Sequence, residues 1–431
     1  MITAIMIGAM VALMLARVPV SIAVGVASLA GILVGGIPLD VLPRMMIESV
    51  DSFALLAVPF FVLAGQLMNA GGITQRIFDF ARDLFGWMRG GLAQVNVVGN
   101  MILAGMSGAA LADLAGLGVV AIRAMRENGY PVPFSAALTL AACVVGPIIP
   151  PSIVLVIYGL ATDTSVGKLF LAGVVPGILI GICLMVHISL WVRLKRPDWG
   201  RPEKFVLAKA MRSLRGGALA LFAPFLLIGS IVAGIATPSE IGAIAAGYAL
   251  LIGIVHRELT WRRLIVCLKE TVAVTAVIMY LIAVSSVMGW IITTERVAHD
   301  AAQLIVTYVQ SPLLGLLVIN LFLLVVGMFI ETVPALLILS SILLPVVKGL
   351  GVDPVHFGII ICYNLIIGII TPPMGIGLFV AARVAGITPE AVLRASWPFF
   401  VPLFASLAAI TAFPALSLWL PTLVYRWFGL G

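Results

Sequence analysis

The chain has 431 residues, of which 62% are hydrophobic and only 10% are charged. Ordinary soluble domains carry about 25% charged residues. The composition therefore excludes an ordinary soluble enzyme and predicts an all-α polytopic membrane protein. The net charge of +7 does not indicate nucleic-acid binding, because the excess of basic residues lies in two short segments beside apolar runs.

Apolar runs that approach or exceed the length of a membrane span recur along the whole chain. They lie at 2–16, 18–36, 135–160, 170–192, 216–236, 239–255, 271–292, 313–330 and 396–421. A hydrocarbon core of ~30 Å needs about 20 apolar residues per helix. Because Arg17 and a second apolar run follow directly, we interpret the first run as a retained helix rather than as a signal peptide.

The two basic segments indicate which side of the membrane they occupy. Residues 193–215 hold eight Lys and Arg against two acids, and residues 256–270 hold four against two. Such loops mark the cytoplasmic side, so the runs between them are predicted to cross out and back. In the turn that joins those runs, Thr237 and Glu240 fit a capping box. Earlier in the chain, residues 71–91 fit an amphipathic interfacial helix.

A repeat appears when the chain is shifted against itself by 222 residues. Gly105-Met106 then matches Gly327-Met328, Gly146 matches Gly368, and Pro150-Pro151 matches Pro372-Pro373. Matches in Gly and Pro are informative because these residues set backbone geometry. We therefore predict two related halves, 1–215 and 216–431. If the first half crosses the membrane an odd number of times, the second half must have the inverted orientation.

Each half contains a hairpin and an interrupted helix in the same order. The hairpins are predicted at about 92–127 and 313–348, with arms of about 12 to 17 residues that are too short to cross. The helices interrupted by Gly and Pro-Pro are predicted at about 135–160 and 356–382. Backbone groups freed by such breaks must be buried in protein or line a wet cavity.

Corresponding breaks in two halves of a membrane protein point to a transport site. The N-terminus of a half-helix carries free N–H groups and partial positive charge, which suit an anion such as a carboxylate. Unwound carbonyls and nearby hydroxyls suit Na⁺. The pattern therefore predicts a transporter that holds a small anion and Na⁺ near mid-membrane.

Candidate residues lie near the two hairpin tips. Ser107 has two open interpretations, as a cap of the second arm and as an oxygen ligand for Na⁺. Asp113 and Glu331 are acids inside apolar segments and are candidates for the ion site or its support. Thr332 and Thr371 are further oxygen donors, although threonine also bonds to helix carbonyls.

Polar residues on neighbouring segments are also candidates. Asn364 is a plausible oxygen donor, and Asn100 and Asn320 on the leading arms of the hairpins are weaker ones. Asn100 and Ser107 are also predicted to bind substrate. Arg383 follows the second Pro-Pro by ten residues and is a candidate partner for a substrate carboxylate. The alternative for Arg383 is a side chain that extends from a helix end toward water.

An intramembrane hydrolase is the remote alternative. Residues 105–108 spell Gly-Met-Ser-Gly, which matches the pattern around the nucleophilic serine of rhomboid-type proteases. That reaction needs a histidine base, and His187 is the histidine that lies well inside an apolar run. A loss of all activity in Ser107→Ala would distinguish this hydrolase from a transporter.

Several long motifs, in one order, resemble the large membrane subunit of tripartite ATP-independent periplasmic (TRAP) transporters, the DctM-like family. They read "VPFFVLAGQLMNAGGI" (58–73), "MRGGLAQVNVVGNMILAGMSGAALAD" (88–113), "GPIIPPS" (146–152), "GIATPSEIGA" (234–243), "GMFIETVPALLIL" (327–339) and "DPVHFGIIICYNLIIGIITPPMGIGLF" (353–379). At the first tip the family pattern usually reads SGS, whereas this chain has Ala109, so a backbone carbonyl would replace a hydroxyl there.

The resemblance implies an elevator-type secondary transporter of the bacterial inner membrane and no enzymatic activity. It implies Na⁺-coupled import of an organic acid, such as a C4-dicarboxylate or sialic acid, from a periplasmic substrate-binding protein (P-type). It also implies a small Q-type membrane subunit of four helices.

The resemblance implies two or more coupling Na⁺ ions. The motifs place the first near Ser107, Gly108, Gly146 and Ile149, and the second near Glu331, Thr332, Thr371 and Met374. Gly368 corresponds to Gly146 under the repeat, so its carbonyl is expected to act similarly.

The main alternative is a single-component organic-anion transporter coupled to ions or protons, which would work without a binding protein. A channel would need a continuous polar lining, which the interrupted segments lack.

Overall fold

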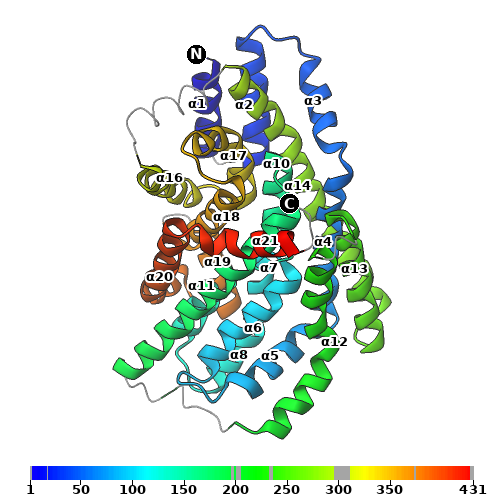
Figure 1. The fold of residues 1–431 in the computed structure, drawn as a ribbon, viewed down its shortest axis with the longest axis vertical. Helices are drawn as coiled ribbons and strands as arrows, with labels where there is room; N and C mark the ends of the chain where they lie inside the picture. The colour runs from blue at the N-terminus through cyan, green and yellow to red at the C-terminus, as the bar shows by residue number, and fades with distance from the viewer. Residues whose placement is uncertain are drawn as a thin grey trace.

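The computed structural model describes residues 2–16, 18–195, 199, 205–232, 236–295, 311–372 and 375–427. Over these residues the chain forms helices and connecting turns and contains no strand. The fold is therefore all-α, as the composition predicts. Figure 1 shows the helices running mostly along the long axis of the molecule, with α21 lying across its middle.

The helices pack mainly in two groups, which the fifth helix links. The first packing group contains α1 (Ile2–Leu15), α2 (Val20–Val34), α3 (Val41–Val50), the 3₁₀ helix η1 (Phe53–Leu56), α4 (Ala57–Ala70), α12 (Leu207–Val232), α13 (Pro238–Val255) and α14 (Trp261–Thr294). The link is α5 (Ile73–Phe85).

The second packing group holds both predicted hairpins and both interrupted helices. It contains α6 (Leu92–Ser107), α7 (Ala110–Ala115), α8 (Leu117–Glu127), α9 (Val132–Cys143), α10 (Ile153–Thr162), α11 (Val166–Lys195), α16 (Pro312–Gly327), α17 (Thr332–Gly349), α18 (Pro354–Ile370), α19 (Ile376–Ala385), α20 (Pro389–Ala412) and α21 (Ala415–Trp427).

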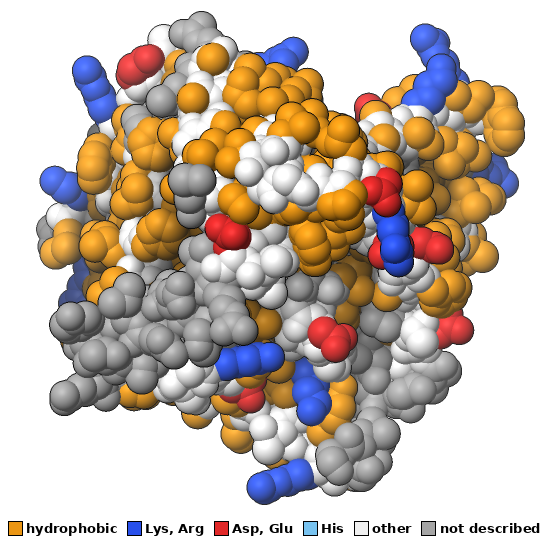
Figure 2. All heavy atoms as spheres, turned by 90° about the horizontal axis from the view of Figure 1, so that it is seen from above, with side chains coloured by type: hydrophobic (Ala, Val, Ile, Leu, Met, Phe, Trp, Pro, Cys, Tyr) orange, Lys and Arg blue, Asp and Glu red, His pale blue; other side chains and the backbone are white. Residues whose placement is uncertain are grey.

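Five described helical segments are long and apolar enough to cross a membrane by themselves. They are Phe53–Ala70, Val166–Lys195, Trp261–Thr294, Thr332–Gly349 and Pro389–Ala412. Shorter apolar helices fill the space between them. Figure 2, which views the molecule along its long axis, shows hydrophobic side chains over much of the upper part of this face, with Lys, Arg, Asp and Glu side chains among them.

Glycines bring helices of the first packing group close together. A Cβ atom placed on Gly242 of α13 would lie 3.0 Å from Cβ of Phe60 on α4. One placed on Gly71, which follows α4, would lie 3.3 Å from Cα of Gly253. Small residues permit this close approach, and in lipid the resulting van der Waals contact is a main source of helix association.

The predicted capping box is confirmed at the start of α13. The backbone N–H of Thr237 donates to Glu240 Oε2 at 2.7 Å, and the Thr237 hydroxyl donates to the same oxygen at 2.8 Å. Glu240 is exposed rather than buried. These contacts account for Glu240 as part of the helix start.

Three sequence-based boundaries differ from the structure. The basic segment 193–215 is not all loop, because α11 continues to Lys195 and α12 begins at Leu207. Long basic side chains can end a spanning helix by reaching water, which lets the helix continue past the apolar run. The run 396–421 is two helices, because Pro414 separates α20 from α21.

The hairpins also differ in detail from the expected pair of single short arms. The return arm of the first hairpin is divided into α7 and α8 at Gly116. The return arm of the second, α17, has 18 residues and is long enough to qualify as a span. In Figure 1, α16 and α17 lie in the upper part of the molecule and α6 and α8 in the lower part.

Candidate functional site

The first interrupted helix is broken over residues 144–152, between α9 and α10. Most of this irregular segment is buried. The Ser152 hydroxyl donates to the Pro147 carbonyl and accepts from the Leu155 N–H at 3.1 Å, which caps α10. The break therefore meets the requirement that irregular backbone in a membrane protein be enclosed by protein.

The tip of the first hairpin packs against this break. Gly108, which follows α6, has φ +62°, a left-handed conformation that glycine adopts without steric cost. A Cβ atom placed on Gly108 would lie 2.5 Å from the Pro151 carbonyl oxygen and 3.0 Å from Cα of Ser152. Only a residue without a side chain fits between the tip and the start of α10.

A buried acid lies beside the same break. Asp113, on α7, is 0% exposed. A Cβ atom placed on Gly146 would lie 2.5 Å from Asp113 Oδ2 and 3.1 Å from the Cys143 carbonyl oxygen. The structure thus places Gly108 against the end of the break and Asp113 beside Gly146 at its start, and all three are residues predicted to form or support an ion site.

The second break is built in a similar way. The helix α18 ends at Ile370, and α19 begins at Ile376 after Gly375, whose φ is +30°. The end of α16 lies directly against α18, because a Cβ atom placed on Gly368 would lie 2.5 Å from Cα of Gly327. In both halves, therefore, the leading arm of a hairpin ends beside an interrupted helix.

The predicted hydroxyls of the second half are both buried. The Thr332 hydroxyl, in the first turn of α17, has no hydrogen-bond partner among the described residues. Thr371, just after α18, donates its hydroxyl to the Ile367 carbonyl at 2.7 Å. Glu331 occupies the N-cap position of α17 and is exposed. A buried hydroxyl without a partner is costly, and it is available to a ligand.

Asparagines tie each leading arm to an interrupted helix. Asn100 on α6 donates to the Asn96 side chain at 2.9 Å and accepts from Cys143 Sγ at 3.2 Å. Asn364 on α18 donates to Asn320 Oδ1 at 2.7 Å. Asn364 Oδ1 is buried and has no donor within the part of the chain that the structure describes.

These networks include residues that the sequence analysis did not single out. Asn96 donates to Thr139 Oγ1 at 2.6 Å, which joins α6 to α9. Asn320 donates to Thr411 Oγ1 at 2.8 Å, which joins α16 to α20. The sequence signal that could have identified them is the presence of polar residues within apolar helices, because a buried side-chain amide needs hydrogen-bond partners.

The remaining candidates lie away from the contacts described above or are not among the described residues. Arg383 is exposed in the last turn of α19. Ile149 packs against Gly177 of α11. The side chain of Ser107 and all of Met374 lie outside the described residues. His187, the base of the hydrolase alternative, packs edge-on against Phe399 with ring centroids 5.8 Å apart.

A cavity lined by hydroxyl groups lies between the two packing groups. Its volume is about 290 Å³, and its walls come from α3, η1 and α14 on one side and from α10 and α17 on the other. The serines in its lining are Ser49, Ser52, Ser285, Ser286 and Ser341. The Ser285 hydroxyl has no hydrogen-bond partner among the described residues. We call this space the serine cavity.

Over the described residues the chain is helical, has five apolar segments of membrane length and buries the break between α9 and α10, which is the architecture of a polytopic membrane protein. Residues 7–416 match the family model described as "Tripartite ATP-independent periplasmic transporter, DctM component". The chain belongs to this family.

Two relatives support the same conclusion. The chain is 45% identical over 386 residues to the sialic acid TRAP transporter large permease protein SiaM of Vibrio cholerae, covering 88% of this chain and 89% of SiaM. It is 40% identical over 380 residues to the sialic acid TRAP transporter permease protein SiaT of Haemophilus influenzae. That match covers 88% of this chain but only 61% of SiaT.

The fold also resembles a solved transporter. The YdaH transporter of Alcanivorax borkumensis superposes with a TM-score of 0.61 at 15% identity, over 91% of this chain and 89% of that one. At this identity the likeness concerns the fold alone. The family relatives are named as transporter permeases rather than enzymes, and the chain is accordingly a multi-pass permease of the inner membrane.

Proposed function

We propose that this chain imports a small organic acid in symport with Na⁺ as the large membrane subunit of a tripartite transporter. The observation that carries the proposal is the pair of enclosed breaks, each with the end of a hairpin arm packed against it. These breaks expose backbone carbonyls and helix N-termini inside the protein, where a desolvated cation and a carboxylate can both be held.

The two halves are proposed to be inverted structural repeats. The packing pattern supports this, because the helices that follow each hairpin make corresponding contacts with elements of the other half. The helix α10 packs against α17, and α19 packs against α7 and α8. Likewise α11 packs against α18, and α20 packs against α9. The opposite placement of the hairpins in Figure 1 agrees with inversion.

The first Na⁺ is proposed to bind at the break after α9. Its proposed ligands are carbonyls of Ser107, Gly108, Gly146 and Ile149, with Asp113 as the nearby charge. Asp113 supports this role because its carboxylate is buried directly beside Gly146. An acid at membrane depth is costly unless it pairs with a cation or another partner.

The second Na⁺ is proposed to bind between α17 and the break after α18. Thr332 is the strongest ligand candidate, because its buried hydroxyl lacks a partner among the described residues. Thr371 and Gly368 lie at the end of α18, where the Gly368 carbonyl accepts from the Thr371 N–H at 3.0 Å and keeps a second lone pair for a cation. Glu331 and Met374 complete the proposed set.

The cargo is proposed to be a hydroxylated or dicarboxylic organic acid. The serine cavity supports this, because its hydroxyls can hydrogen-bond to the oxygens of such an acid. The relatives SiaM and SiaT are named for sialic acid, which is itself a hydroxylated carboxylic acid.

Transport is proposed to follow an elevator mechanism in which the second packing group moves against the first. The serine cavity lies at the boundary that such a movement would remodel. A periplasmic binding protein and a small four-helix membrane subunit are the proposed partners. The family description and the greater length of SiaT, of which this chain matches 61%, support them.

The experiment is uptake in proteoliposomes that contain the transporter with its binding protein. A radiolabelled organic acid should accumulate when an inward Na⁺ gradient is imposed. Imposing an inside-negative K⁺ diffusion potential with valinomycin should speed this uptake if transport carries net positive charge inward. Uptake driven by a proton gradient alone, at an unchanged rate without Na⁺, would refute Na⁺ coupling. Uptake without the binding protein would refute the tripartite assignment.

A further inference from the structure

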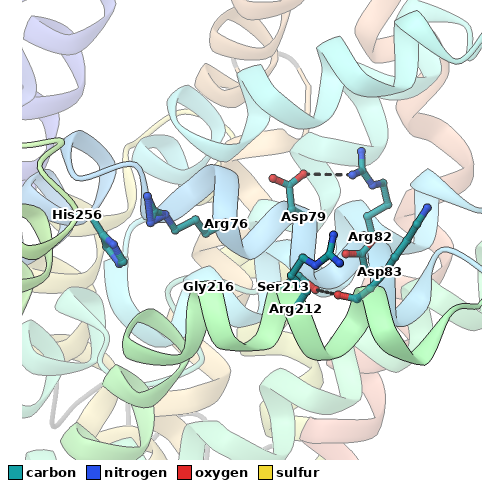
Figure 3. A pocket seen from close by; sticks show the side chains of 9 residues that line it. Arg76, Asp79, Arg82, Asp83, Arg212, Ser213, Gly216 and His256 are labelled. Carbon is teal, nitrogen blue, oxygen red and sulfur yellow. Dashed lines mark hydrogen bonds and ion pairs between the residues drawn. The ribbon is translucent and has the colours of Figure 1, made fainter.

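A charged pocket lies between α5, α12 and the end of α13, away from both helix breaks. Its volume is about 800 Å³. The lining residues are Arg76, Asp79, Arg82 and Asp83 of α5, Lys209, Arg212, Ser213 and Gly216 of α12, and His256. Figure 3 shows Arg212 extending from α12 toward α5. We call this space the α5–α12 pocket.

The lining of this pocket has an excess of positive charge. The lining holds four basic residues, Arg76, Arg82, Lys209 and Arg212, and two acids, Asp79 and Asp83, so four positive charges less two negative ones leave +2 with His256 neutral. Two of the arginines are paired: Arg76 with Glu258 at 3.7 Å and Arg82 with Asp79 at 3.6 Å. Lys209 and Arg212 form no ion pair with the described residues, so both can bind an anion.

The pocket includes residues of both basic segments, 193–215 and 256–270. The excess of basic residues in these segments predicts that the pocket lies on the cytoplasmic side. The helix α5 buries Ile77 and Phe78 on one face and contributes charged side chains to the pocket from another. Such an amphipathic helix suits the headgroup region.

An apolar surface continues from the pocket toward the membrane interior. On α12, Leu219 is 40% exposed, Phe222 is 54% exposed and Phe225 is 73% exposed. From Arg212, these side chains lie about 10 to 20 Å farther along the helix, at 1.5 Å per residue. A ligand with an anionic head and apolar chains would match both parts of the surface.

We propose that the α5–α12 pocket binds the phosphate headgroup of an anionic phospholipid from the cytoplasmic leaflet. Lys209 and Arg212 bind the phosphate, and the acyl chains lie along Leu219 and Phe222. Basic pockets between membrane helices on the cytoplasmic side recognise such headgroups. The apolar surface favours a phospholipid over free phosphate, which would use the charges alone.

The position of the pocket gives the lipid a functional consequence. The helix α5 links α4 of the first packing group to α6, the leading arm of the first hairpin. A lipid that bridges α5 and α12 therefore holds the link between the two packing groups. The transport rate should depend on the fraction of anionic lipid in the membrane.

The test is native mass spectrometry of the purified full-length protein titrated with dimyristoyl phosphatidylglycerol. The double variant Lys209→Gln/Arg212→Gln should weaken binding by roughly tenfold or more, since each basic residue near the surface contributes severalfold. Arg126→Gln is the matched control, because Arg126 is exposed at the end of α8 and is not part of the pocket lining. This control should bind like the parent protein.

A second variant separates the proposal from a folding defect. Asp83→Asn removes a negative charge from the lining, so it should strengthen lipid binding severalfold, a result that misfolding does not produce. Equal affinity for dimyristoyl phosphatidylcholine, full competition by millimolar inorganic phosphate, or equal losses in the double variant and in Arg126→Gln would each overturn the proposal.

Discussion

Gly327 and Gly368 bring the end of α16 and the end of α18 into backbone contact. A Cβ atom placed on Gly368 would lie 2.5 Å from both Cα and the carbonyl carbon of Gly327 and 2.7 Å from its carbonyl oxygen. No side chain fits at Gly368 unless the helices separate. The repeat pairs Gly368 with Gly146, where a side chain would instead meet Asp113.

Gly368→Ala should therefore destabilise the protein by about 1–3 kcal/mol, because overpacking of a close contact shifts the backbone. Thermal unfolding in detergent measures the change. Gly247→Ala is the matched control, because a Cβ atom there has nothing within 4 Å and alanine is the better helix former. A parent-like unfolding temperature for Gly368→Ala would show that α16 and α18 do not touch in this way.

Gly146→Ala should weaken both stability and Na⁺ dependence, because the new methyl group displaces the Asp113 carboxylate. In an Asp113→Ala background the same substitution should cost less stability, since the clashing oxygen is gone. A double-mutant cycle on unfolding temperatures measures this coupling. Additive effects of the two substitutions would contradict the contact between Gly146 and Asp113.

Thr332→Val should raise the Na⁺ concentration for half-maximal uptake by roughly tenfold, since a hydrogen-bonding or ligand contact to a charged group contributes about 1.5–3 kcal/mol. Stability should change little, because the hydroxyl has no partner among the described residues. Thr275→Val is the control, because the Thr275 hydroxyl on α14 also has no hydrogen-bond partner among the described residues. An identical shift in both variants would remove Thr332 from the proposed site.

Ser341→Trp should block uptake, because the indole fills part of the serine cavity at the boundary between the packing groups. Ser341→Ala should keep most of the uptake and thereby show that position 341 tolerates substitution. Ser230→Trp, on α12 outside the cavity, should keep transport. Counterflow of radiolabelled cargo in proteoliposomes is the measurement. Normal counterflow in Ser341→Trp would exclude the cavity from the route.

Stability should fall on acidification through His256, which follows the end of α13. Burial and the positive charge of Arg76 hold the pKa of His256 below its ordinary value, and Glu258 offsets part of this effect. Because the unfolded chain takes up the proton first, the contribution is complete above pH ~6.5 and is lost as pH falls to the folded pKa. His256→Gln should flatten the unfolding temperature between pH 7.5 and pH 5; an unchanged slope would contradict this role.

The main elements were predictable because their signals are local. Apolar runs predicted the membrane helices, and the 222-residue spacing of Gly and Pro located both breaks within a few residues of where α9 and α18 end. The capping box at the start of α13 was predictable from three nearby residues, Thr237, Pro238 and Glu240. Helix boundaries at Lys195 and Leu207 were harder, because basic residues are tolerated in a helix that extends beyond the bilayer.

Individual contacts of the candidate site were not predictable in the same way. The sequence identified Asp113, Gly146 and Thr332 as candidate residues, but it did not predict that the Asp113 carboxylate packs against Gly146. It also did not pair Asn96 with Thr139 or Asn320 with Thr411, residues 43 and 91 positions apart. Polar residues in one apolar helix look alike until a partner helix is placed beside them.

The sequence by itself determined that this chain is helical, lies in a membrane and interrupts two of its helices at related positions. Those features follow from side-chain hydrophobicity and from the local backbone limits of Gly and Pro. Only the tertiary structure decided which groups meet at the breaks and that α5 and α12 enclose a basic pocket. Contacts between distant segments depend on how helices pack, and that packing is set jointly by many residues rather than by any one stretch.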